Sequence, residues 1–452
     1  MKTFDKTEKH DSNYLAAIFK IEHIRKHNNA DRLQIVTVFA NNIVTGLTAK
    51  EGDLYVYFPL ECAISQEFLS YTNSFRDKTL NRDTTQAGFF ENNNRVRAAK
   101  LRNERSEGYI VPVSELENFA RDVLGQTIVI DEQYVGHDFD LFLEHQICKK
   151  YIPRGYRTPG EPGSKKARGN IKKYESKLVE NQFKFHPDTA HLKREIKNIN
   201  PDDYIAISEK LHGTSVVLSN VLCKKKLSLR DKIVKWFGVS VKDVGYDKLY
   251  SSRTVIKNVR LDQPTDAHFY DSDVWGIVAD KYYPVLQKGY TFYGEIVGYT
   301  PSGAMIQKGY DYGCNPGELE FYVYRMTFTN EDGTVFELSP LQVKDYCDRY
   351  GVKTPDLHYF GKAKDMFPEL SVEQHWHDNF LQKLMETYLE GKCYMSKSDV
   401  YREGIILRRD VPNRWDVYKL KSFNFIMGET AERDSGQVDM ESQESSEEPE
   451  IE

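Results

Sequence analysis

The chain has 452 residues, of which 40% are hydrophobic and 29% are charged, and its formal net charge is −6. This length allows two or three domains with their own cores. Because there is no run of about 18 apolar residues and the N-terminus is polar, we expect neither a membrane span nor a signal peptide.

The six cysteines are scattered and form no Cys-x-x-Cys pair, a pattern that indicates reduced thiols and an intracellular location and that argues against a zinc ribbon or a disulfide framework. They are Cys62, Cys148, Cys223, Cys314, Cys347 and Cys393.

The first region, residues 1–148, alternates short β-type runs with polar turns, as in residues 33–38 and 54–58. This sequence pattern is typical of small antiparallel barrels. Residues 29–33 and 95–102 resemble the OB-fold modules that are related to tRNA-binding domains, so we expect an OB-like nucleic-acid-binding domain. Five cations on or beside one predicted strand are either contacts for a nucleic-acid backbone or a solvated charged face. They are Arg95, Arg97, Lys100, Arg102 and Arg105.

Residues 149–178 are rich in Pro and Gly and contain ten Lys or Arg against two Glu, which predicts a flexible basic linker. At the other end, residues 429–452 carry ten Asp or Glu and one Arg. That segment has a net charge of −9 and, by subtraction from −6, the rest of the chain has +3. We expect residues 429–452 to be a disordered acidic tail.

The stretch of residues 207–215 is flanked by β-branched apolar runs and contains Gly213, so it is predicted to be a hairpin, that is, a strand, a tight turn at Gly213 and a second strand. It carries Lys210. A lysine becomes a nucleophile when burial and neighbouring cations lower its pKa.

Further motifs follow in order. Arg253 comes after a predicted strand end, Tyr293 and Glu295 lie in an aromatic strand, Phe321 begins another, and Glu403 opens a strand with Gly404. Lys419 and Lys421 then lie on one face of a last strand, because strand side chains repeat every two residues.

In type and order these segments resemble motifs I, Ia, III, IIIa, IV and V of the covalent nucleotidyltransferases, which are the RNA ligases, DNA ligases and mRNA capping enzymes. The Lys-Leu-His-Gly, Tyr-Gly-Glu and Tyr-Lys-Leu-Lys segments are most similar to RNA ligases, and the N-terminal OB-like region is most similar to the RNA ligase 5 family. The resemblance implies an α+β chain with an ATP-grasp-like nucleotidyltransferase domain, built of antiparallel sheets and flanking helices, over residues 179–428.

The resemblance also implies an ATP-dependent RNA ligase that uses Mg²⁺ or Mn²⁺ and joins 3′-OH and 5′-phosphate ends at nicks in RNA-containing duplexes. Lys210 would form a lysyl-adenylate, Lys419 and Lys421 would neutralise the α-phosphate, and Glu295 and Glu403 would hold the metal. We expect a monomer without a membrane partner. The implied nucleotide-binding residues are Glu209, Lys210, His212, Gly213, Arg253, Tyr293, Glu295, Phe321 (which would stack on adenine), Glu403, Lys419 and Lys421.

Two other functions fit the same motifs: a GTP-dependent RNA guanylyltransferase, and a catalytically inactive RNA-binding repair scaffold. The C-terminal OB domain of DNA ligases and capping enzymes is not seen after Ser422.

Helices are predicted at residues 340–350 and 372–389. They lie in a long segment, 331–400, to which the sequence assigns no role. His375 and His377 are two residues apart and do not share a helix face, which argues against a metal pair.

Overall fold

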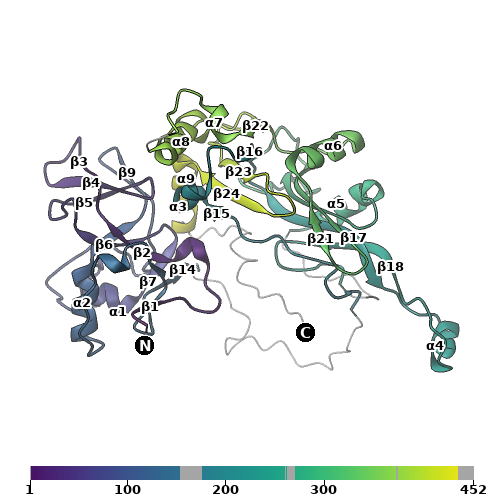
Figure 1. Ribbon diagram of the computed structural model, residues 1–452, viewed down its shortest axis with the longest axis horizontal. Helices are drawn as coiled ribbons and strands as arrows, with labels where there is room; N and C mark the ends of the chain where they lie inside the picture. Colours follow the sequence, from purple (N-terminus) through teal and green to yellow (C-terminus); the bar gives the residue numbers. More distant parts are fainter. Residues whose placement is uncertain (1, 153–175, 260, 262–269, 373–374, 436–452) are drawn as a thin grey trace. The chain divides into compact units, whose positions relative to one another are not determined.

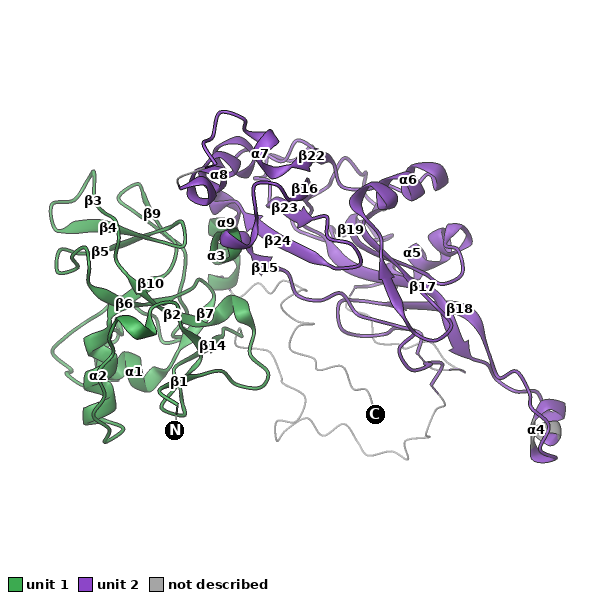
Figure 2. Ribbon diagram, in the orientation of Figure 1, with its two compact units in different colours: residues 1–153, 193–196, 426–434 green, residues 154–192, 197–425, 435–452 purple. Residues whose placement is uncertain are grey.

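The computed structural model describes residues 2–152, 176–259, 261, 270–372 and 375–435, so most of the predicted linker and residues 436–452 lie outside the described residues. The chain divides into two compact units, shown in Figures 1 and 2. Unit 1 takes in Met1–Pro153, Lys193–Ile196 and Ile426–Asp434, and unit 2 takes in the rest.

Unit 1 is built from small, mainly antiparallel sheets around an aromatic core. The largest has the strand order β10-β6-β2-β11, and β3, β4 and β5 form a meander. The strands are β1 (Phe4–Asp5), β2 (Ala16–Lys20), β3 (Ile24–Lys26), β4 (Leu33–Val38), β5 (Asn41–Gly46), β6 (Leu54–Phe58), β7 (Cys62–Ile64), β8 (Ala99–Leu101), β9 (Glu104–Ser106), β10 (Tyr109–Pro112), β11 (Asp138–Phe139), β12 (Leu141–Phe142), β13 (His145–Gln146) and β14 (Cys148–Lys150). The helices are α1 (Gln66–Tyr71) and α2 (Val113–Asp122), with part of α3 (Leu192–Glu195).

The two strand runs predicted in this region are confirmed as β4 and β6. Alternate side chains of β6 enter two hydrophobic clusters: Val56 and Phe58 pack in one with Phe119, and Tyr55 and Tyr57 pack in the other with Val36 and Val38 of β4. Burial of these large aromatic residues stabilises unit 1. Among the described residues, however, the strand pairings leave separate sheets and do not close a barrel.

Unit 2 contains two five-stranded sheets (Figure 1). The first, in spatial order, is β15 (Ala190–His191), β24 (Asp416–Lys421), β23 (Gly404–Arg409), β16 (Tyr204–Lys210) and β22 (Leu357–Lys362). The second is β18 (Val244–Ser251), β17 (Thr214–Lys224), β19 (Tyr290–Gly298), β20 (Leu319–Thr329) and β21 (Val335–Glu337). Except for β15 with β24, all neighbours in these two sheets are antiparallel.

Helices α5 (Val274–Tyr282) and α6 (Pro340–Tyr350) pack on one face of the second sheet. The predicted helix at 340–350 is confirmed as α6, which begins at a capping box made by Ser339 and Gln342 and ends at Gly351 with a φ of 66°. The remaining helices are α4 (Leu229–Trp236), α7 (Ala363–Met366), α8 (Trp376–Leu384), which continues into a π-helical segment at Met385–Leu389, and α9 (Phe423–Asp434).

Two further expectations need correction. The strands on either side of Lys210 do not form a hairpin, because β16 belongs to the first sheet and β17 to the second. Residues 429–434, predicted to begin a disordered tail, are the last turns of α9, and ion pairs with unit 1 residues hold them there. None of the described helices has the length and hydrophobicity needed to span a bilayer.

Candidate active site

The turn that carries the predicted nucleophile connects the two sheets of unit 2 and is held by three hydrogen bonds. The backbone N–H of His212 donates to the Tyr312 hydroxyl at 2.6 Å, and that of Gly213 donates to Glu295 Oε1 at 3.1 Å. Gln307 Nε2 donates to the carbonyl of Gly213 at 2.8 Å. A Cβ atom on Gly213 would lie 2.2 Å from the carbonyl oxygen of Ile296, so the close approach of two backbones requires glycine here.

Two of the predicted lysines share one buried carboxylate. Lys210 Nζ lies 2.8 Å and Lys421 Nζ 3.2 Å from Glu403 Oε1. Strand register explains the meeting, because Gly404 in β23 pairs with Lys210 in β16 on one side and with Lys421 in β24 on the other. A Cβ atom on Gly404 would lie 2.0 Å from the carbonyl oxygen of Leu420, which keeps this rung free of a side chain.

Lys419 lies one rung further along the same face of β24, opposite Ile406. Burial, followed by the nearby charges of Lys421, Lys210 and Arg253, lowers the pKa of Lys419 to about 8. The structure therefore gathers Lys210, Lys419 and Lys421 on one face of the first sheet, where they would attract a phosphate group.

The two predicted metal ligands present carboxylate oxygens at the Lys210 turn. Glu295 Oε1 accepts the Gly213 N–H, while Glu403 Oε2 is buried and has no hydrogen-bond donor among the described residues. A buried carboxylate oxygen without a donor suits a hard cation. Within the described part of the chain, no group of three His, Cys, Asp or Glu is arranged to hold a metal by itself.

His212 is placed beside this carboxylate. Its ring lies edge-on to Tyr310 and Phe425, each with a centroid distance of 4.9 Å, and its Nδ1 is 4.0 Å from Glu403 Oε2. The histidine thus borders the same oxygen that lacks a donor.

Glu209, which was predicted to bind nucleotide, has its carboxylate engaged by other protein side chains. It is buried and bonded by Arg402, whose Nε donates to Oε1 at 3.2 Å, and by His358 Nε2 at 2.9 Å from Oε2. Because Glu209 and Arg402 directly precede Lys210 and Glu403, this ion pair fixes the two strands that present the candidate nucleophile and its carboxylate. Sequence reasoning missed Arg402 and His358, although the position of Arg402 next to Glu403 was a usable signal.

Two other predicted nucleotide contacts have protein partners. Arg253 forms an ion pair with Asp188, another residue that the sequence reasoning did not select. Tyr293 is buried, its hydroxyl donates to the carbonyl of Lys184 at 3.1 Å, and the guanidinium of Arg325 lies 4.3 Å from its ring.

The prediction that Phe321 stacks on adenine is wrong in this structure. Phe321 is fully buried and lies against the rings of Tyr282 and Phe292 in the core that α5 and α6 cover. Directly opposed residues of an antiparallel pair share a face. Since Phe321 pairs with Ile296, and Tyr322 with Glu295, the ring that shares the Glu295 face is that of Tyr322.

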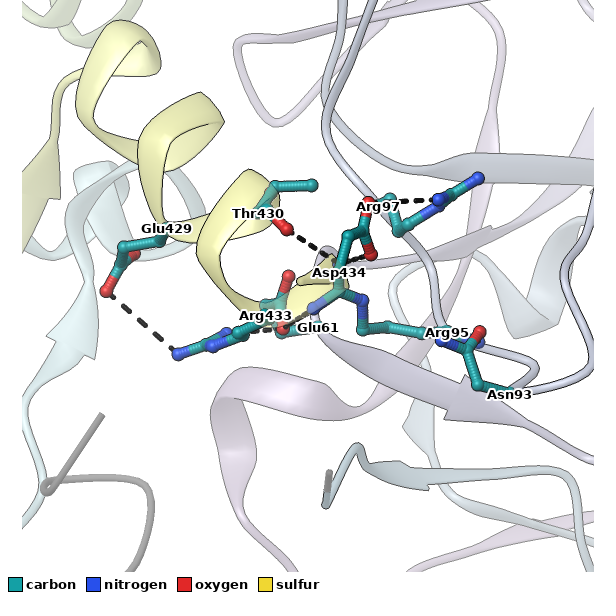
Figure 3. A network of polar contacts seen from close by, with 8 residues as sticks. All are labelled: Glu61, Asn93, Arg95, Arg97, Glu429, Thr430, Arg433 and Asp434. Carbon is teal, nitrogen blue, oxygen red and sulfur yellow. Dashed lines mark hydrogen bonds and ion pairs between the residues drawn. The ribbon is translucent and has the colours of Figure 1, made fainter. Parts of the chain in front are cut away.

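The N-terminal cations separate into two groups. Arg95, only 1% of whose side chain is exposed, forms ion pairs with Asp434 at 2.7 Å and Glu61 at 3.5 Å, and Arg97 reaches the other oxygen of Asp434 at 3.0 Å (Figure 3). These two arginines therefore hold the end of α9. The other three lie on the β8–β9 hairpin, where Lys100 and Arg102 are exposed and Arg105 is half-buried.

The chain was compared with known proteins. A family model described as RNA ligase matches residues 203–421, and no curated protein matches the chain. A Naegleria gruberi RNA ligase variant solved with AMP and Mn has a TM-score of 0.55 at 16% sequence identity, and the match covers 92% of this chain and 98% of that one. Another variant of that ligase, solved with ATP and Mn, has a TM-score of 0.53 at 15% identity, covering 93% and 99%. The same ligase with PPi has a TM-score of 0.54 at 15% identity, covering 92% and 99%.

The chain has an α+β fold in which a lysine and two carboxylates lie where two mainly antiparallel sheets join. Together with the family match, this site defines the class of protein, a phosphodiester-bond-forming ligase. Residues 203–421, just under half of the chain, match the RNA ligase family model.

Proposed function

We propose that the protein is an ATP-dependent RNA ligase that joins 3′-OH and 5′-phosphate ends at nicks in RNA-containing duplexes, and that its site residues other than Phe321 act as their motifs imply. The observation that carries this proposal is the contact of Lys210 and Lys421 with one buried carboxylate, Glu403, inside the region that the RNA ligase family model matches.

In the first step Lys210 Nζ, after losing its proton, attacks the α-phosphorus of ATP, so that a P–N bond forms and pyrophosphate leaves. Lys419 and Lys421 offset the charge of the α-phosphate. A Mg²⁺ or Mn²⁺ ion held by Glu403 and Glu295 would compete with Lys210 for the carboxylate, disfavour the charged lysine and neutralise phosphate charge.

In the second step a 5′-phosphate oxygen of the RNA attacks the lysyl-AMP, and Lys210 leaves. In the third, the 3′-hydroxyl attacks the activated 5′-phosphorus and AMP leaves. Each step is a transfer at phosphorus, in which positioning and charge neutralisation supply most of the catalysis.

For unit 1 we propose an OB-like module that holds RNA, with Lys100 and Arg102 as contacts for phosphates. Their exposure on one hairpin supports this role. We further propose that the enzyme is an intracellular monomer and is most similar to the RNA ligase 5 family.

The decisive experiment is incubation with α-labelled ATP or GTP and Mg²⁺ or Mn²⁺, followed by denaturing electrophoresis and mapping of the labelled peptide. We expect label from ATP on Lys210, none in Lys210→Ala, and faster sealing of a nicked duplex than of free single strands. Label from GTP alone would instead identify a guanylyltransferase. RNA binding without label from either nucleotide would identify an inactive scaffold.

A further inference from the structure

The hairpin of β17 and β18 carries a basic, amphipathic excursion that no motif of the ligase site explains. The last strand pair is Lys224 with Val244, and the chain between them forms α4, which stands beyond the ends of both strands (Figures 1 and 2). We define the arm as residues 224–242. Ser228 and Asp231 bond each other across the first turn of α4, so the helix begins at a defined cap.

The arm has an extreme charge for its length. It contains seven Lys or Arg and one acid, Asp231, which gives a net charge of +6 in 19 residues. Lys224, Lys225, Lys226 and Arg230 are all exposed. This density of cations matches a polyanionic partner.

The arm also exposes large apolar side chains. Trp236 is 80% and Phe237 70% exposed, and their rings are in edge-to-face contact at 4.8 Å. Leu229 and Ile233, 81% and 56% exposed, precede them at helical spacing. Exposed aromatic rings beside cations bind nucleic acids by stacking on unpaired bases, and apolar side chains insert between base steps.

We propose that the arm is a second RNA-binding element, in which the cations contact backbone phosphates and Trp236 and Phe237 contact bases. This inference rests on the proposed function, because it takes its RNA from the ligase reaction. Charge complementarity and the position of the arm inside the RNA ligase domain favour RNA over a lipid surface as the partner.

The length of β17 sets where the arm touches the substrate. The Lys210 turn precedes Thr214 at one end of this strand, and the arm begins at Lys224 at the other end. Ten residue steps at about 3.3 Å each place the arm about 33 Å from the turn. At about 3 Å per base pair, between the rise of A-form and B-form duplexes, this distance corresponds to roughly ten base pairs.

The test compares the full chain with two arm variants, W236A/F237A and a triple Lys→Ala change at 224, 225 and 226. The matched control removes three cations from α6 and α8, the exposed Lys344 and Arg349 and the half-buried Lys383. Three quantities are measured on each: lysyl-AMP formation without RNA, the Kd for nicked RNA duplexes at several salt concentrations, and sealing rates on duplexes of decreasing length on either side of the nick.

We expect unchanged lysyl-AMP formation in every variant, and a Kd raised roughly tenfold by W236A/F237A. A plot of log K against log salt concentration should be less steep for the triple lysine variant, and its slope should decrease by up to about 0.9 for each phosphate contact that is removed. The wild type should seal long duplexes faster than the arm variants do. This difference in sealing rate should disappear on duplexes with fewer than roughly ten base pairs on one side of the nick.

Wild-type RNA affinity in both arm variants, with normal lysyl-AMP formation, would overturn the inference while leaving the ligase function intact. Binding to anionic vesicles that depends on Trp236, without any effect on RNA, would overturn it in favour of a membrane surface. Failure of the wild type to form lysyl-AMP would count against the proposed function instead, and the Kd comparison would still judge the arm.

Discussion

Lys419 loses its charge near neutral pH, and this has consequences for catalysis. Its pKa is lowered from 10.5 to about 8, first by burial and then by neighbouring cations. Below about pH 8 the lysine is charged and can offset phosphate charge, and above it the lysine is neutral. We therefore expect the single-turnover rate of adenylylation to fall as the pH rises through about 8.

The matched variant is Lys419→Arg, because a guanidinium stays charged over this range. Its rate should be lower overall but should keep rising or remain level above pH 8. An unchanged descending limb in this variant would show that another group titrates. The same shift favours the neutral lysine in the folded state, so the contribution of Lys419 to the free energy of unfolding should increase as the pH rises from about 8 to 10.5.

Gly213 is required by the close approach of two backbones at the Lys210 turn. In Gly213→Ala the new methyl group would meet the carbonyl of Ile296, so the turn must shift and move Lys210. A displacement of about 1 Å at a catalytic group costs roughly 100-fold in rate, and we expect a loss of that order in adenylylation. Gly46→Ala is the control, since a Cβ atom there has no neighbour within 4 Å. Equal rates in both variants would contradict this account.

At the scale of elements, the segment 331–400 now has a structural role. It supplies β22, which pairs with β16 along the strand that ends at Lys210, and His358 on β22 contacts Glu209. The backbone N–H of Glu209 also donates to the carbonyl of Asp356 at 2.9 Å. The segment therefore supports the strand of the candidate nucleophile from its outer edge.

The Glu209–Arg402 pair should act as a positioning device. Arg402→Met leaves a buried carboxylate without its main partner, which typically costs about 3–5 kcal/mol in the free energy of unfolding. The double variant Glu209→Leu/Arg402→Met removes both charges and should recover much of that loss. Urea unfolding measures both, and additive losses in the double variant would show that the pair is not coupled.

At the scale of the whole molecule, α9 links the two units through the chain itself. It begins directly after β24, which carries Lys419 and Lys421, and its last residues are part of unit 1. Arg433 adds an ion pair with Glu61, and both Glu429 and Glu61 help to raise its pKa against the effect of burial.

Asp434→Asn should destabilise unit 1, because buried Arg95 and half-buried Arg97 both lose a carboxylate. We expect a loss of roughly 1–3 kcal/mol in the free energy of unfolding, less than for a fully buried pair because Asp434 is 37% exposed. Asp5→Asn, which breaks the exposed pair with Lys2 in the same unit, should lower the free energy of unfolding much less, because an exposed ion pair contributes little. Similar losses in the two variants would show that the α9 contact contributes little.

Local patterns in the sequence determined several elements of this protein. The alternation at β4 and β6 and the capped apolar repeat of α6 predicted these elements because neighbouring residues alone specify them. The common face of Lys419 and Lys421 followed from strand periodicity. The order of the motifs along the chain indicated the ligase class, which the family match bears out.

Only the tertiary structure decided which strands pair and which distant residues each side chain contacts. The sequence around Lys210 has the local pattern of a hairpin, yet long-range pairing sends β16 and β17 into different sheets. Strand register likewise placed Phe321 in the core. Packing of distant segments brought Glu209 to Arg402 and Asp434 to Arg95, so that these charges form ion pairs. These contacts link residues up to 339 positions apart, and no local pattern encodes such a pairing because its energy exists only once the sheets and helices have packed.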